Sequence, residues 1–224
     1  MIELLFPKKC CYCKKSGYNI CPNCYQFIID KTKSYQKCPK CHKPSYNGFT
    51  HSSCLPFALD GIHVLYQYSS ITKALLSEYK YKFIKELETP IINLFLEGLE
   101  NNDLLNYWKR DKFCLMAVPS FKTKNNWRGF DSLKEISKII GQKTGLNLND
   151  NSLTKVKWTR QQAGLSKKER KKNIKDAYQI TCKETIKNVL IVDDVYTTGS
   201  TLEQIAKLFK KNNSSKVWGL TLAG

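Results

Sequence analysis

The chain has 224 residues, 42% of them hydrophobic, and its 37 Lys and Arg against 19 Asp and Glu give a formal net charge of +18. This hydrophobic content argues against a wholly disordered chain and suffices for one medium domain plus a small appendage. The excess of positive charge is typical of proteins that bind polyanions, with nucleic acid ahead of an anionic membrane surface, although a lysine-rich proteome would also produce it.

No segment reaches the roughly 18 consecutive apolar residues that a membrane span needs. Residues 91–99 come nearest, but two polar residues and a glycine interrupt them. Residues 1–6 are too short for a secretory signal. We therefore expect a cytoplasmic protein without an integral membrane segment. In that reducing compartment, clustered cysteines are thiols or metal ligands rather than disulfides.

The first predicted element is a cysteine-rich module. Eight of the ten cysteines lie before residue 55, mostly as C-x-x-C pairs, and such a turn directs two sulfur atoms at one ion. The predicted ligands form two sets: Cys10, Cys13, Cys21 and Cys24, then Cys38, Cys41, His51 and Cys54. Cys11 is a spare thiol or a register alternative to Cys10. Alternatively, His51 is a loop residue and the second site is empty.

The spacing of both sets fits zinc better than an iron–sulfur cluster. Each set of four ligands is closed, which favours a structural role over a catalytic one. The module has few large apolar residues, so we expect metal binding to supply its folding energy.

After residue 56, strand-like and helix-like segments alternate. The expected strands are 62–68, 113–118, 189–192 and 217–222, and the expected helices are 71–79, 90–99, 133–140 and 202–209. This alternation predicts βαβ units and a mostly parallel sheet. We therefore predict a zinc-binding module at residues 1–56, followed by an α/β domain at residues 57–224.

The segment Val189–Thr201, VLIVDDVYTTGST, carries the most information about function. Four apolar residues form a buried strand, and two acids follow at its carboxyl end, where open α/β sheets bind ligands. A turn rich in hydroxyl groups then leads directly into a helix. This arrangement directs backbone N–H groups and the positive end of the helix at an anion. The acids would then contact ribose hydroxyls or a bound magnesium ion.

Three alternatives compete for this segment. A receiver domain also begins with an apolar strand and two acids, but it needs about a hundred further residues and only 30 follow Asp194. The acidic strand of a P-loop ATPase would require a G-x-x-x-x-G-K-[ST] motif, which the chain lacks. The third alternative is a purely structural strand end and helix cap.

The same thirteen residues resemble the signature of type I phosphoribosyltransferases, which bind phosphoribosyl pyrophosphate (PRPP). The cysteine module, Tyr79–Lys82, Val118-Pro119, 128–130 and residues 159–178 further resemble the ComF family of competence proteins. That family joins a double zinc ribbon to a domain of phosphoribosyltransferase type, and its members work beside a DNA helicase-like partner on incoming single-stranded DNA. The resemblance therefore implies a location at the DNA-uptake machinery.

The resemblance also implies roles for individual residues. Asp193 and Asp194 are the implied catalytic pair, in contact with the ribose hydroxyls of PRPP and its magnesium. The phosphoribosyl-binding loop comprises Val195, Tyr196, Thr197, Thr198, Gly199, Ser200 and Thr201, and its part from Thr197 onward holds the 5-phosphate. Three departures weaken the match: His51 replaces a usual cysteine, Asp131-Ser132 replaces Asn-Gln, and Lys155 replaces a frequent arginine.

A basic segment is the predicted nucleic-acid surface. Residues 155–175 hold nine basic residues and one acid, with Trp158 among them, and basic residues with an aromatic suit non-specific single-strand binding. The predicted contacts are Arg128, Lys155, Lys157, Trp158, Arg160, Lys167, Lys168, Arg170, Lys171 and Lys172. The alternative is a solvated basic helix face.

Three functions follow, in order of preference. The first is a protein that handles single-stranded DNA in natural competence and DNA uptake. The second is a zinc-ribbon adaptor for a helicase partner, with a vestigial nucleotide site. The third is an active phosphoribosyltransferase, for which the sequence specifies no acceptor.

Overall fold

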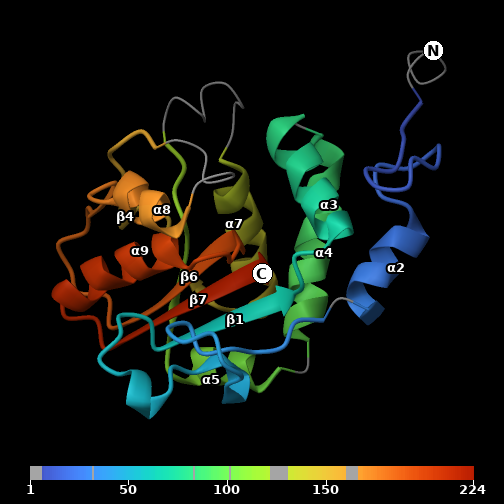
Figure 1. Ribbon diagram of the computed structural model, residues 1–224. Coiled ribbons are helices and arrows are strands. Elements are labelled where there is room, and N and C mark those ends of the chain that lie inside the picture. The colour runs from blue at the N-terminus through green and yellow to red at the C-terminus, as the bar shows by residue number, and fades with distance from the viewer. Residues whose placement is uncertain (1–6, 32, 83, 101, 122–130, 160–165) are drawn as a thin grey trace.

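The computed structural model describes residues 7–31, 33–82, 84–100, 102–121, 131–159 and 166–224. Its central sheet has five parallel strands in the order β1-β7-β6-β2-β3 (Figure 1). The strands are β1 (Gly61–Tyr66), β2 (Cys114–Ala117), β3 (Asn147–Leu148), β6 (Asn188–Val195) and β7 (Lys216–Ala223). A separate antiparallel pair joins β4 (Leu153–Lys155) to β5 (Tyr178–Ile180). The predicted α/β class with a mostly parallel sheet is confirmed.

Seven α-helices are described in these ranges. They are α2 (Pro22–Lys31), α3 (Ser70–Tyr81), α4 (Glu88–Leu99), α5 (Asp103–Arg110), α7 (Ser132–Thr144), α8 (Lys167–Ile174) and α9 (Ser200–Lys211). Short 3-10 helices cover Tyr46–Gly48, Ser52–Cys54 and Lys85–Leu87. The capping box of Ser69 and Thr72 starts α3, and Gly145 ends α7 in the left-handed conformation. The expected helices are confirmed with longer bounds, whereas α2, α5 and α8 were not among the expected ranges.

The core lies on both faces of the sheet. Along β6, Leu190 and Val192 belong to one apolar cluster and Val189 and Ile191 to the other, as the period of two in a strand requires. Helices α4 and α7 pack on the first face, and α9 packs on the second (Figure 1). This double burial explains why the β6 sequence is continuously apolar rather than alternating.

The cysteine-rich module covers the free edge of the sheet at β1. The Gln36 side-chain amide donates to the Val64 carbonyl at 2.9 Å and accepts from the Val64 N–H at 3.2 Å, so it pairs as a neighbouring strand would. The Ser34 N–H donates to the Leu65 carbonyl at 3.0 Å. These bonds satisfy backbone groups that an edge strand otherwise leaves unpaired.

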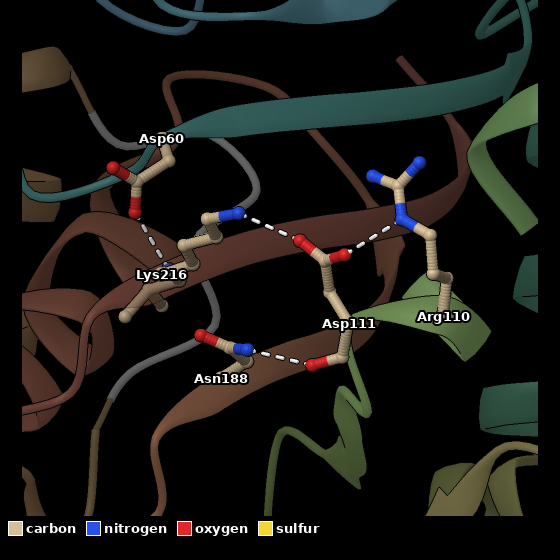
Figure 2. Close-up of polar contacts among 6 residues, drawn as sticks. Asp60, Arg110, Asp111, Asn188 and Lys216 are labelled. Atoms are coloured by element: carbon tan, nitrogen blue, oxygen red, sulfur yellow. Dashed lines mark hydrogen bonds and ion pairs between the residues drawn. The ribbon is translucent and has the colours of Figure 1, made fainter. Parts of the chain in front are cut away.

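A polar network closes the amino-terminal edge of the sheet (Figure 2). Asp111 accepts from Lys216 Nζ at 2.7 Å and from Arg110 Nε at 3.0 Å, while its carbonyl accepts from Asn188 Nδ2 at 2.7 Å. The hydrogen bond from Lys216 is the main cause of the lowered pKa of Asp111. The network joins the end of α5 to the starts of β6 and β7. It therefore lies at the opposite edge from Asp193 and Asp194.

Candidate functional site

The first set of predicted metal ligands converges in space. The sulfur atoms of Cys10, Cys13, Cys21 and Cys24 all lie within 4.8 Å of one another. Sulfurs bound to one tetrahedral ion at about 2.3 Å lie roughly 3.8 Å apart, so the set can hold a metal ion. Cys11 stays outside the set. Burial is the main cause that raises the pKa of its thiol to about 12, which keeps it protonated.

The second set converges as well. Cys38, Cys41, His51 and Cys54 place one ligand atom each within the same 4.8 Å limit, and the distance from Cys41 Sγ to His51 Nδ1 is 3.4 Å. Burial alone would raise the pKa of Cys38. Backbone hydrogen bonds from Cys41, His51 and Lys40 outweigh it and lower that pKa to about 7. The pKa of Cys54 is instead raised, with burial as the main cause. The convergence of the four ligand atoms is what makes this set suitable for an ion.

The predicted phosphate loop joins β6 to α9, as expected from the sequence. Gly199 adopts φ +68 at the N-cap of α9, a left-handed conformation that glycine accommodates without steric cost. Ser200 and Thr201 are buried in the first helical turn, and the hydroxyls of Thr198 and Ser200 lie 2.8 Å apart. The N–H groups at the start of a helix and the helix dipole suit an anion.

The two acids at the end of β6 have pKa values shifted in opposite directions. Lys80, at the end of α3, forms an ion pair with Asp194. Burial would raise the pKa of Asp194, but the Lys80 charge, together with hydrogen bonds from Asp193 and Lys80, lowers that pKa. Burial, followed by the Asp194 charge, raises the pKa of Asp193 well above its usual value. The two carboxyl groups therefore have pKa values displaced in opposite directions, Asp193 upward and Asp194 downward.

A cavity of about 490 Å³ lies in front of these groups. Of the predicted site residues, those that line it are Asp193, Asp194, Val195, Tyr196, Thr197, Gly199, Ser200 and Thr201. Lys155 and Arg170, both predicted as nucleic-acid contacts, line it too, and Arg170 Nη1 donates to Thr197 Oγ1 at 2.7 Å. Lys155 Nζ lies 5.4 Å from the ring centroid of Tyr178. The basic segment thus reaches the phosphate loop.

The remaining predicted nucleic-acid residues are placed unevenly. Lys157, Lys168 and Lys172 are exposed, and Trp158 exposes 55% of its surface. Arg128 and Arg160 lie outside the described residues, as do the side chains of Lys167 and Lys171. Exposed cations beside an exposed indole are compatible with either a nucleic-acid surface or a solvated face.

Sequence reasoning missed one residue of the site, Lys80, and one contact of a predicted residue, Tyr196. Lys80 appeared only within Tyr79–Lys82, and nothing local indicates that it reaches Asp194. Tyr196 was assigned to the phosphate loop, but its hydroxyl donates to the Pro39 carbonyl in the cysteine-rich module at 3.0 Å. Local sequence signals could not have revealed either contact, because Lys80 is far from Asp194 in sequence and Tyr196 is far from Pro39.

Within the described ranges, no helix is both long and apolar enough to cross a bilayer.

Several known proteins resemble this chain, although no protein-family model matches it. It is 25% identical over 232 residues to competence protein F of Haemophilus influenzae, covering 97% of this chain and 98% of that protein. It is 26% identical to DNA utilization protein YhgH of Escherichia coli K12, with the same coverage. Competence protein ComFC of Bacillus subtilis is 25% identical over 162 residues, covering 70% of this chain and 62% of that protein.

Among solved structures, a hypoxanthine phosphoribosyltransferase of Trypanosoma cruzi is 12% identical, with a TM-score of 0.35 over 61% of this chain and 64% of that one. That likeness is too distant to bear on fold or function. The sequence relatives, in contrast, cover almost the whole chain, so the expected resemblance to competence proteins of this kind is confirmed.

Proposed function

We propose that this homologue of competence protein F takes part in DNA uptake, where it handles single-stranded DNA and binds a phosphoribosyl group. The homologues' names support the cellular role. The observation that carries the molecular role is the 490 Å³ cavity, because the phosphate loop, the acid pair and two cationic side chains of the basic segment all line it.

The chemistry of the cavity suits a 5-phosphate on a ribose. The N–H groups at the start of α9 would hold the phosphate, together with Arg170 at the edge of the loop. Ionised Asp194 would accept hydrogen bonds from ribose hydroxyls. PRPP would arrive with magnesium, since its pyrophosphate needs a divalent counterion. Bases of a single strand would stack on Trp158 while Lys157 and Lys172 contact phosphates.

We further propose that both cysteine-rich sets hold zinc in a structural role, within a module of residues 1–56 ahead of the domain of residues 57–224. The protein would act in the cytoplasm, at the DNA-uptake machinery and beside a helicase-like partner. The sets of four ligands support this role because they leave no position for a substrate.

Titration calorimetry tests the proposal. The full chain should bind PRPP with magnesium, and separately a single-stranded oligonucleotide whose affinity falls steeply with salt, as phosphate contacts require. Absence of oligonucleotide binding at low salt, or affinity that ignores salt, would reject the DNA role. Absence of PRPP binding would reject the phosphoribosyl site.

Catalysis is a second candidate, and the acid pair favours it. Asp193 and Asp194 have pKa values shifted in opposite directions, an arrangement that separates a proton donor from an acceptor. A transferase would replace the pyrophosphate of PRPP with a nitrogen nucleophile. Pyrophosphate release should then be measured with a panel of amine and base acceptors, and release no greater than that of Asp194→Ala would exclude turnover.

A further inference from the structure

Tyr196 connects the phosphate loop to the second metal-ligand set. Its hydroxyl donates to the Pro39 carbonyl at 3.0 Å, although the two residues are 157 positions apart. Pro39 follows Cys38 directly, and its neighbour Lys40 donates to the Cys54 carbonyl at 2.8 Å. Tyr196 therefore holds the turn that carries two of the four ligands.

The ring of Tyr196 also packs against Gly199 in the phosphate loop. A Cβ atom placed on Gly199 would lie 2.6 Å from the Tyr196 hydroxyl oxygen, so the ring fills the space beside that glycine. The backbone N–H of Tyr196 donates to the Ala223 carbonyl at 2.7 Å, which ties the start of the loop to the end of β7. The side chain thus lies between the glycine of the loop and the ligand turn.

Metal binding to the second set would determine how rigidly the Pro39 carbonyl, the acceptor of the Tyr196 hydroxyl, is held in place. With an ion bound, Cys38, Cys41, His51 and Cys54 are cross-linked and the Pro39 carbonyl has a fixed position. Without an ion, the turn loses this cross-link and keeps weaker contacts, such as the hydrogen bond from His42 N–H to the Cys38 carbonyl at 2.9 Å and the one from Lys40 Nζ to the Cys54 carbonyl at 2.8 Å. The acceptor of Tyr196 then moves with the turn, and the loop loses a fixed neighbour.

We propose that Tyr196 is a positioning residue that couples metal binding in the second set to phosphate binding in the loop. The inference rests on the proposed function, because it assumes that the loop holds a sugar phosphate. Coupling between two sites is reciprocal. The phosphate ligand should therefore slow release of metal from the second set, and metal should strengthen phosphate binding.

Calorimetric titration of the metal-loaded full chain with ribose 5-phosphate tests the first direction. Tyr196→Phe removes only the hydroxyl, and loss of its hydrogen bond should weaken binding about fivefold. Tyr66→Phe is the matched control, since it removes another buried hydroxyl-to-carbonyl bond, to Leu94 at 3.1 Å, on residues that do not line the described cavity. Equal affinities in the wild type and Tyr196→Phe would overturn the coupling.

Metal release to a colorimetric chelator tests the second direction. If each ligand set releases its ion in a separate kinetic phase, the phase that is missing in His51→Ala is the release from the second set. Tyr196→Phe should accelerate that phase and leave the other unchanged, and ribose 5-phosphate should slow it in the wild type but not in Tyr196→Phe. Unchanged release in Tyr196→Phe would overturn the inference. Failure of the wild type to bind ribose 5-phosphate would count against the proposed function instead. In that case, the rate of metal release from Tyr196→Phe without ligand would still show whether Tyr196 stabilises the second set.

Discussion

Lys80 and Asp194 form an ion pair that joins the last turn of α3 to the carboxyl end of β6. The pair places a cation inside the cavity, next to the acids that would contact a ribose. The positive charge of Lys80 offsets the negative charge of the Asp194 carboxylate, and burial raises the pKa of Asp193, which disfavours a second negative charge beside it. Both effects reduce the repulsion that an anion would meet at the neighbouring phosphate loop.

Lys80→Met should destabilise the fold, because it leaves the Asp194 carboxylate without its counter-charge. The Asp194 side chain is 14% exposed and Lys80 is 32% exposed, so we expect a loss of about 1–2 kcal/mol, less than for a fully buried pair. Lys82→Met is the control, since its pair with Glu78 is 66% exposed on the lysine side and is worth less than about 0.5 kcal/mol. Urea denaturation measures the free energy of unfolding of both variants. Equal losses would contradict the view that the Lys80–Asp194 pair stabilises the fold more than the exposed Lys82–Glu78 pair.

Asp193→Asn should stabilise the protein increasingly as the pH rises. The pKa of Asp193 is raised in the folded state, so above about pH 4 the unfolded chain loses this proton while the folded chain keeps it, and stability falls. Asparagine removes that loss and can still accept from the Asp194 N–H through Oδ1, as Asp193 does at 2.9 Å.

We expect the gain of the variant to grow across the range from about pH 5.5 to 7, with a slope of at most about 1.4 kcal/mol per pH unit, the limit for one proton. Denaturation curves should start there, because more acidic solutions protonate the metal-binding thiols. A gain independent of pH would show that Asp193 is ionised in the fold.

Gly199→Ala should weaken binding of ribose 5-phosphate about tenfold or more, because the new methyl group would collide with the Tyr196 ring and displace the loop. Gly145→Ala provides the control. Gly145 has a similar φ of +75, but its Cβ would meet nothing nearer than 3.8 Å, so only the backbone strain is shared. Calorimetry should show near-normal affinity for Gly145→Ala, and a similar result for Gly199→Ala would argue against phosphate binding at this turn.

His51→Ala should reduce the metal content from two ions per chain to about one, because only three ligands of the second set remain. His42→Ala is the matched control. Its ring lies 6.3 Å from that of Tyr196 and contributes no ligand atom to either set. Elemental analysis after gel filtration counts the ions, and two ions retained in His51→Ala would exclude the histidine as a ligand.

Trp158→Ala should lower the affinity for a single-stranded oligonucleotide about tenfold, because a stacked base contributes on the order of 1–3 kcal/mol. Val156→Ala is the control, since Val156 is similarly exposed, at 50% against 55% for Trp158. Fluorescence anisotropy at several salt concentrations should show an unchanged salt slope for Trp158→Ala, because no phosphate contact is lost. An affinity loss shared by both variants would point to a general change of the segment.

The fold and the local parts of the site could be predicted from the sequence because their signals are contiguous. The apolar run before Asp193 and the hydroxyl-rich turn after it form one segment, and each C-x-x-C pair specifies its own turn. Helix α5 was missed because it is only eight residues long and buries just Leu104 and Trp108. So short a pattern does not distinguish a helix from a loop.

The long-range contacts could not be predicted. Arg170 was expected on a nucleic-acid surface, and nothing in its own segment indicates that it also donates to Thr197. The contact of Gln36 with Val64 is equally hidden, because a glutamine in a loop carries no sign of which strand it will pair with. Such contacts depend on how finished elements are arranged in space, which one sequence without relatives does not specify.

The contact of Gln36 with β1 makes the solubility of the α/β domain depend on the cysteine-rich module. Severing the chain near residue 56 would strip β1 of the side-chain amide and backbone bonds that now occupy its outer edge. Exposed strand edges recruit strands from other molecules. The part after residue 56, prepared alone, should therefore tend to self-associate through β1, from which the cysteine-rich module protects it in the full chain.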